Sequence, residues 1–264
     1  MGAVGLGADL DGDFVSDFVA RSWSEQYPTV YWVGSSQWGE LGVGDALATI
    51  RVADGIEEIT RDRYQATDAF PFDVEGDGVD ESLVVLGAQR DEGSYGWEHL
   101  GWAWILPSGA VGDTMDEAAD IVIHDEAEAL REVAAFGDLD GNGYEDLVVA
   151  LDGALALLSG PFGGNVSILD AASRVDVDVD LIWGLDDGDM DGDGGTDILF
   201  HANALGDTEE DIYVVSDLAV GGTMDAARLR LDHQSPEEFW PLYLYDVDED
   251  GRDDLAGRYV FLTR

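Results

Sequence analysis

The chain has 264 residues, 45% of them hydrophobic, which is enough apolar material for one large all-β domain or two small ones. It carries 58 acidic residues against 12 basic ones, all of them arginine, and its formal net charge of −46 disfavours nucleic acids and anionic membranes as partners. Cysteine is absent, which excludes disulfides and thiolate metal sites, and no run of 18 apolar residues predicts insertion into a membrane. Two alternative causes would each explain the lack of lysine, namely high-GC coding bias or adaptation to high salt.

One acidic pattern recurs five times along the chain. Its copies cover residues 9–17, 73–81, 138–146, 189–197 and 246–254, and their starts are separated by 64, 65, 51 and 57 residues. A short apolar run follows each copy, such as "LVVAL" after the third. A period of about 59 residues indicates a repeat architecture rather than independent polar turns.

Two further segments recur in phase with the acidic one. The first four copies are each followed by an apolar segment with strand-like character, namely "TVYWVG", "GWAWIL", "ALALLSG" and "DIYVVS". A small-polar segment comes next, namely "GDALATIRV", "DTMDEAADIVI", "VSILDAASRVDV" and "GTMDAARLRL". Each repeat therefore predicts about four short strands, with the acidic loop between the first and the second.

Four-stranded repeats of this length are typical of β-propeller blades, because a single blade cannot bury both of its faces alone. We therefore predict an all-β fold in which residues 1–264 form a single β-propeller domain. Its five blades are expected near residues 1–60, 61–130, 131–180, 181–235 and 236–264. The last blade is expected to be incomplete, because few residues follow the fifth loop.

The spacing of the acids within each copy predicts a calcium site. We number the nine residues of each copy as positions 1–9. Acids at positions 1, 3, 5 and 9 only repel one another unless a cation lies among them, and Ca²⁺ prefers hard oxygen ligands. Position 7 would add a backbone carbonyl, and glycine at position 6 in four copies permits a sharp turn. The predicted ligands are Asp9, Asp11, Asp13, Val15, Asp17, Asp73, Glu75, Asp77, Val79, Glu81, Asp138, Asp140, Asn142, Tyr144, Asp146, Asp189, Asp191, Asp193, Gly195, Asp197, Asp246, Asp248, Asp250, Arg252 and Asp254.

An EF-hand is the main alternative for such a loop. It requires a glutamate at position 12 and flanking helices. Position 12 is occupied here by non-acidic residues in strand-like runs, namely Ala20, Val84, Val149, Phe200 and Gly257. The sequence therefore excludes an EF-hand and predicts that position 9 closes the site.

The loops, their spacing and the apolar run after each resemble the FG-GAP repeats of integrin α-subunit propellers and related bacterial proteins. "AFGDLDGNGYEDLVVA" contains the FG pair at Phe136 and Gly137, and "LVVLGAQ" at residues 83–89 is similar to the strand that ends in GAP. The resemblance covers four repeats and a shortened fifth. It implies Ca²⁺ in hairpin loops on one rim of a propeller. The family usually closes seven blades, so we expect this chain to be part of a longer secreted protein.

The resemblance also implies a function, namely that of an extracellular or cell-surface module for binding or adhesion, with a protein or a glycan as partner. A purely structural propeller within a larger secreted protein is the main alternative. A propeller enzyme acting on polysaccharide is a further one, but no catalytic motif supports it, so we expect no enzyme. Tyr95 and Trp97 are candidates for an exposed aromatic platform, whereas Trp102 and Trp104 are expected to pack between blades.

Overall fold

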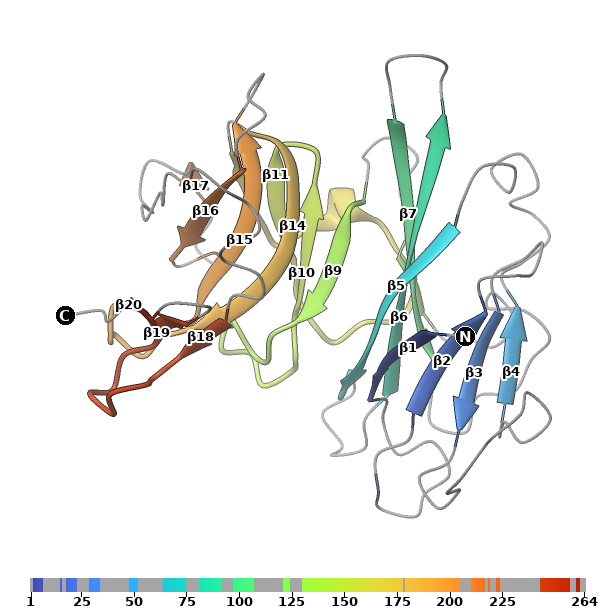
Figure 1. Cartoon of the computed structure of the whole chain (residues 1–264), viewed down its shortest axis with the longest axis horizontal. Coiled ribbons are helices and arrows are strands. Elements are labelled where there is room, and N and C mark those ends of the chain that lie inside the picture. The colour runs from blue at the N-terminus through green and yellow to red at the C-terminus, as the bar shows by residue number, and fades with distance from the viewer. Residues whose placement is uncertain are drawn as a thin grey trace. The chain divides into compact units, whose positions relative to one another are not determined.

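The computed structural model consists of short strands connected by loops (Figure 1). Helical structure among the described residues is limited to short 3-10 turns such as η3 (Ile168–Asp170), and no described helix is long and apolar enough to cross a membrane. The protein is therefore all-β in the part that is described. The structure describes residues 2–6, 15, 18–22, 29–33, 48–51, 64–74, 81–91, 97–106, 121–123, 130–177, 179–204, 210–216, 218, 222–223, 243–256 and 260–261.

The chain divides into two compact units. The first comprises Met1–Leu130, Asn142–Glu145 and Gly160–Asp170. It contains an antiparallel sheet with the strand order β1 (Gly2–Leu6), β2 (Phe18–Ser22), β3 (Thr29–Val33), β4 (Ala48–Arg51). Its second sheet has the order β12 (Gly164–Val166), β8 (Ile121–Ile123), β7 (Trp97–Leu106), β6 (Glu81–Asp91), β5 (Tyr64–Phe72).

The second unit comprises Arg131–Gly141, Asp146–Ser159 and Ala171–Arg264, and it contains three sheets. The third sheet of the chain has the order β17 (Gly222–Thr223), β13 (Ser173–Asp176), β11 (Ala154–Leu158), β10 (Leu147–Leu151), β9 (Glu132–Ala135). The fourth consists of β14 (Val179–Gly188), β15 (Asp197–Ala204), β16 (Glu210–Val215). The fifth consists of β18 (Tyr243–Tyr245), β19 (Asp254–Ala256), β20 (Val260–Phe261).

The predicted strand order within a repeat is confirmed. In all five sheets the acidic segment lies between the first strand and the second, which pair in antiparallel fashion. The first three repeats also supply the predicted third and fourth strands. Within the described residues the fourth and fifth sheets have three strands, and no sheet closes on itself. The single propeller of five blades therefore stays a prediction.

Two short strands differ from the expected pattern. β12 belongs to the third repeat but pairs in parallel with β8 of the second sheet. β17, at the start of the small-polar segment of the fourth repeat, pairs in parallel with β13 of the third sheet. The segment expected to be only an outer strand of its own repeat thus begins by extending the preceding sheet.

The core of the second unit explains why the run after each loop is apolar at successive positions. Phe200 on β15 belongs to a buried cluster with residues of the third sheet, such as Val148, and its ring stacks on Tyr213 with a centroid distance of 5.4 Å. The adjacent residue Leu199 belongs to a separate buried cluster that includes Leu255 of the fifth sheet. Successive side chains of a strand point to opposite faces, so β15 is covered on both sides. Consecutive sheets of this unit pack face to face.

Candidate metal centres

The third, fourth and fifth loops are described in full, and each brings three aspartates together. In each group one oxygen from each carboxylate lies within 4.8 Å of the others. Positions 1, 3 and 9 form the groups of the third and fourth loops, whereas positions 1, 3 and 5 form that of the fifth. The groups are Asp138, Asp140 and Asp146; Asp189, Asp191 and Asp197; and Asp246, Asp248 and Asp250. Two predicted acids, Asp193 and Asp254, lie outside these groups.

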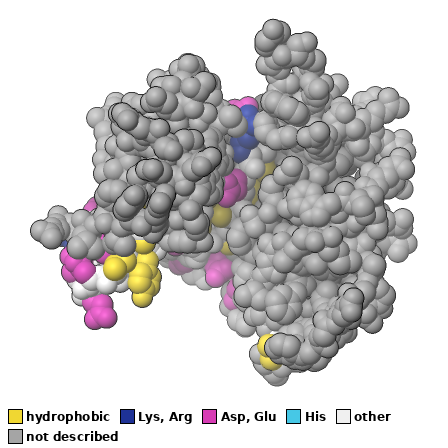
Figure 2. Space-filling model, viewed as in Figure 1, with side chains coloured by type: hydrophobic (Ala, Val, Ile, Leu, Met, Phe, Trp, Pro, Cys, Tyr) yellow, Lys and Arg dark blue, Asp and Glu magenta, His cyan; other side chains and the backbone are white. Residues whose placement is uncertain are grey.

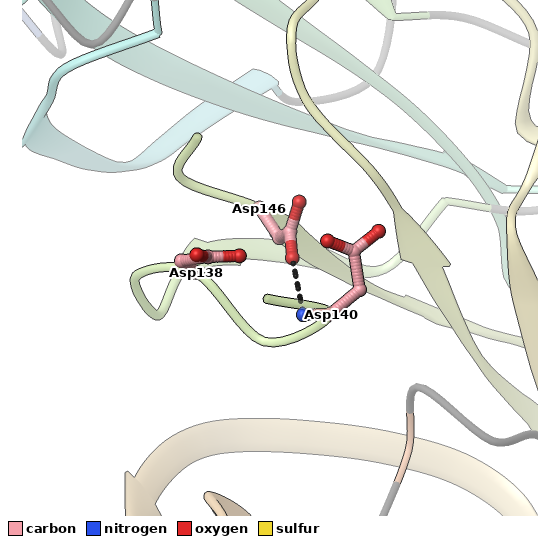
Figure 3. Close-up of side chains that lie close together, drawn as sticks. All are labelled: Asp138, Asp140 and Asp146. Atoms are coloured by element: carbon pink, nitrogen blue, oxygen red, sulfur yellow. Dashed lines mark hydrogen bonds between the residues drawn. The ribbon is translucent and has the colours of Figure 1, made fainter. Parts of the chain in front are cut away.

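The position 9 carboxylate closes the loop. In the third loop it accepts hydrogen bonds from the backbone N–H of Leu139 at 2.9 Å and from that of Asp140 at 3.1 Å, the second of which is drawn in Figure 3. When ionised, the position 9 side chain can only accept hydrogen bonds or bind a cation. The same bond, from the position 2 N–H to the position 9 carboxylate, recurs in the second, fourth and fifth loops at 3.0, 2.8 and 3.1 Å.

Backbone N–H groups also hold the side-chain oxygens at positions 1 and 5. The position 1 carboxylate accepts from Gly141 in the third loop, from Gly192, Asp193 and Gly194 in the fourth, and from Asp250 and Gly251 in the fifth. The position 5 oxygen accepts the N–H of position 7 in all three loops, at 2.8, 2.7 and 3.1 Å. These bonds fix the side-chain oxygens before any ion binds, because the donors belong to the turn itself.

Left-handed backbone at two positions gives the loops their shape. The predicted glycines at position 6 have φ of 93°, 85° and 88° in the third, fourth and fifth loops, a conformation that costs glycine little. Position 4 is left-handed as well, with φ of 78° at Gly141 and 77° at Gly192. In the fifth loop Glu249 takes this position with φ of 60°. The requirement at position 4 was missed, although glycine occupies it in the other four copies.

The geometry of each group fits a divalent cation. Two ligands of one Ca²⁺ lie about 2.3–2.6 Å from the ion, so they can be separated by at most about 5.2 Å. The observed limit of 4.8 Å therefore lets one ion contact all three carboxylates. Burial raises the pKa of Asp197, and the nearby carboxylates of Asp191 and Asp189 raise it further, against the hydrogen bonds from Ser216 and Met190. Each group could hold a metal ion.

The first two loops are described only in part. Val15 is exposed in the first loop, and Asp73 and Glu81 are half-buried in the second. The other predicted ligands of these loops lie outside the described residues, namely Asp9, Asp11, Asp13, Asp17, Glu75, Asp77 and Val79. The carbonyls at position 7 stay predictions in every loop.

A second acidic group was not predicted from the sequence. Asp186 and Asp187 on β14 lie close enough to Asp253 of the fifth loop for their charges to interact. Burial raises the pKa of Asp187 to about 6, and repulsion from Asp186 and Asp253 adds to the shift. The Asp186 carboxylate accepts the N–H of Leu244 at 2.8 Å. The sequence did contain a signal for Asp253, because an acid also occupies position 8 in the second and third copies, at Asp80 and Glu145.

The aromatic candidates are described only in part. Trp104 is completely buried, as expected for a residue that packs in a core. Trp97, a candidate for the exposed platform, begins β7, and Tyr95 lies outside the described residues, so the platform stays a prediction. In contrast, Tyr245 and Val247 are 65% and 42% exposed at the start of the fifth loop. Figure 2 shows hydrophobic and acidic side chains side by side at this end of the second unit.

No protein-family model matches the sequence, and no curated protein matches it at a significant level.

Proposed function

We propose that this protein is a calcium-binding β-propeller that acts as an extracellular module for binding or adhesion. The observation that carries the proposal is the recurrence of one geometry. Three loops, whose starts are 51 and 57 residues apart, each bring one oxygen from each of three carboxylates within 4.8 Å of one another. An acidic turn without a ligand gains nothing from repeating such a repulsive arrangement.

The chemistry of the loops favours Ca²⁺ over Mg²⁺. All the predicted side-chain donors are carboxylate or amide oxygens, which suit both ions. Mg²⁺ demands a near-ideal octahedron at about 2.0–2.1 Å, whereas Ca²⁺ accepts six to eight oxygens in an adaptable geometry. The carboxylates that lie together belong to positions 1, 3 and 9 in the fourth loop and to positions 1, 3 and 5 in the fifth. Ca²⁺ accommodates such different arrangements better than Mg²⁺ does, because its coordination geometry is adaptable. We therefore assign the loops to Ca²⁺.

The ions would stabilise the ends of the repeats. Each loop joins the first two strands of its sheet, so a bound ion fixes both strand ends by cancelling repulsion among the acids. Every site held at 100 times its dissociation constant adds about 2.7 kcal/mol to the free energy of unfolding, if the unfolded chain does not bind.

A binding role is supported by the surface beside the fifth loop. Tyr245 is 65% exposed, and it precedes the exposed acid Glu249, which is not among the predicted calcium ligands. An exposed aromatic ring beside a carboxylate suits a sugar or a polar protein surface, because the ring offers a stacking face and the acid accepts hydrogen bonds. Protein and glycan ligands are the partners that this surface would select, as the resemblance to FG-GAP repeats also implies.

Thermal unfolding in three buffers of equal ionic strength tests the calcium assignment. We expect millimolar Ca²⁺ to raise the melting temperature well above its value in chelator. Mg²⁺ serves as the control, because it screens the net charge equally but fits the loops poorly. Equal melting curves in Ca²⁺ and Mg²⁺ would mean that the ions act only by screening. A glycan and protein array probed with Ca²⁺ and with chelator then tests the binding role, and a Tyr245→Ser variant should lose any ligand found.

A further inference from the structure

Two hydrogen bonds connect the fourth loop to the fifth. The backbone N–H of Asp189 donates to the Asp253 carboxylate at 2.6 Å, and the N–H of Asp253 donates to the carbonyl oxygen of Asp189 at 2.7 Å. The two residues are 64 positions apart in the chain. This reciprocal pair fixes the distance and the orientation between the two loops.

Both partners of this pair belong to a candidate metal site or adjoin one. Asp189 is position 1 of the fourth loop, and its carboxylate is one of the three that lie together there. Asp253 is position 8 of the fifth loop and directly precedes Asp254, whose buried carboxylate closes that loop through the N–H of Val247. An ion that orders one loop would therefore restrain the backbone of the other.

Close packing strengthens this connection. A Cβ atom on Gly192 would lie 2.9 Å from Cγ of Arg252, and one on Gly188 would lie 2.7 Å from an oxygen of Asp253. Position 7 of the fifth loop thus rests on position 4 of the fourth loop. With so little space between them, the loops cannot shift independently.

One of the two hydrogen bonds between the fourth and fifth loops, from the N–H at position 1 to the acid at position 8, has a counterpart in the first unit. There the Glu145 carboxylate, at position 8 of the third loop, accepts the N–H of Asp73, at position 1 of the second loop, at 2.9 Å. An acid at position 8 thus reaches position 1 of the preceding loop in two separate places. The fourth loop has Thr196 at position 8, which is shorter and uncharged. The recurrence of this contact in two pairs of loops supports a structural role for the acid at position 8.

We infer that Asp253 is a positioning residue that couples the fourth and fifth loops, so that an ion bound in one raises the affinity of the other. This inference rests on the proposed calcium binding. Coupling between two sites is reciprocal, so each ion changes the affinity for the other by the same factor. Typical couplings of this kind amount to about 5-fold to 150-fold in affinity.

Calcium titrations of the full chain, followed by the amide resonances of Gly194 and Gly251, test the coupling at each loop separately. Disabling the fifth loop with Asp248→Ala and Asp250→Ala should weaken calcium binding at the fourth loop by about fivefold or more. In an Asp253→Ala background, disabling the fifth loop should change the calcium affinity of the fourth loop by less than about twofold. Asp253→Asn keeps an acceptor oxygen and should restore the coupling. Asp176→Ala serves as the control, because it removes an exposed acid that pairs with Arg174 outside the loops. In this background, disabling the fifth loop should weaken calcium binding at the fourth loop as much as in the wild type.

Amide exchange gives a second measurement that keeps Asp253 intact. In an Asp191→Ala variant, whose fourth loop is disabled, Ca²⁺ should slow exchange of the Asp189 N–H, and the additional loss of Asp248 and Asp250 should abolish this protection. Two results would overturn the coupling without contradicting calcium binding. The first is that disabling the fifth loop changes the calcium affinity of the fourth loop equally with and without Asp253. The second is that loss of Asp248 and Asp250 does not change the exchange rate of the Asp189 N–H. Resonances of Gly194 and Gly251 that do not respond to Ca²⁺ would overturn both proposals.

Discussion

Glu132 on β9 accepts a hydrogen bond from the backbone N–H of Gly184 on β14, with a distance of 2.7 Å between Oε2 and N. Its other carboxylate oxygen accepts the N–H of Leu185 at 3.2 Å. One side chain thus satisfies two donors at the bulge where β14 loses register with β15, between Trp183 and Asp186. The third and fourth sheets are connected through this carboxylate.

Replacing Glu132 by alanine should lower the free energy of unfolding by about 2–4 kcal/mol, because two part-buried backbone donors lose a charged acceptor. Glu132→Gln keeps one acceptor oxygen and should cost about half as much. Asp170→Ala, at an exposed position, serves as the control and should change stability by less than about 0.5 kcal/mol. Urea unfolding measures all three, and a Glu132→Ala midpoint equal to that of the control would contradict the bridging role.

Asp146 has two separable roles, which two substitutions distinguish. In chelator, Asp146→Asn should be at least as stable as the wild type, because its amide oxygen still accepts the N–H groups and one repelling charge is gone. Asp146→Ala should lose about 2–4 kcal/mol, because this fully buried site then leaves its donors unsatisfied. In millimolar Ca²⁺ both variants should fall below the wild type. If Asp146→Asn gains as much from Ca²⁺ as the wild type does, position 9 is not a ligand.

The left-handed turn at position 6 should make alanine costly without any clash. A Cβ on Gly194 meets no atom within 4 Å, and φ is 85° there. Gly194→Ala should therefore cost only the strain of that backbone, about 1–2 kcal/mol. Gly163 is equally open and has no left-handed φ, so Gly163→Ala should be neutral or slightly stabilising. The melting temperatures of Gly194→Ala and Gly163→Ala in chelator measure this difference. Equal melting temperatures would contradict the left-handed conformation at Gly194.

The sequence predicted the parts of the fold that depend on local pattern. The strand after each loop could be recognised because runs such as "LVVAL" are apolar at every position, and β10 is indeed buried throughout. The absence of an acid at position 12 also led us to expect position 9 to close the metal site. Val149 and Phe200 at position 12 are indeed buried in strands, and the metal-binding role of position 9 stays a prediction.

The contacts between repeats could not be predicted in this way. Periodicity gives the spacing of repeats along the chain but not their relative register, and the bonds of Glu132 to β14 and of Asp253 to Asp189 depend on that register. The acids of β14 were also missed, because Asp186 and Asp187 look like solvated residues in so acidic a chain. Nothing in the sequence indicated that Glu249 has a left-handed φ, because glutamate rarely adopts this conformation.

Counting bound ions by calorimetric titration of the full chain with Ca²⁺ tests the central claim most directly. We predict one ion for each of the five acidic copies in the wild type, and one fewer in Asp191→Ala, which removes an exposed carboxylate from the fourth loop. Asp176→Ala, an equal loss of charge outside the loops, should leave the count unchanged. An identical number of ions in Asp191→Ala and the wild type, or no binding to the wild type at millimolar Ca²⁺, would contradict the account.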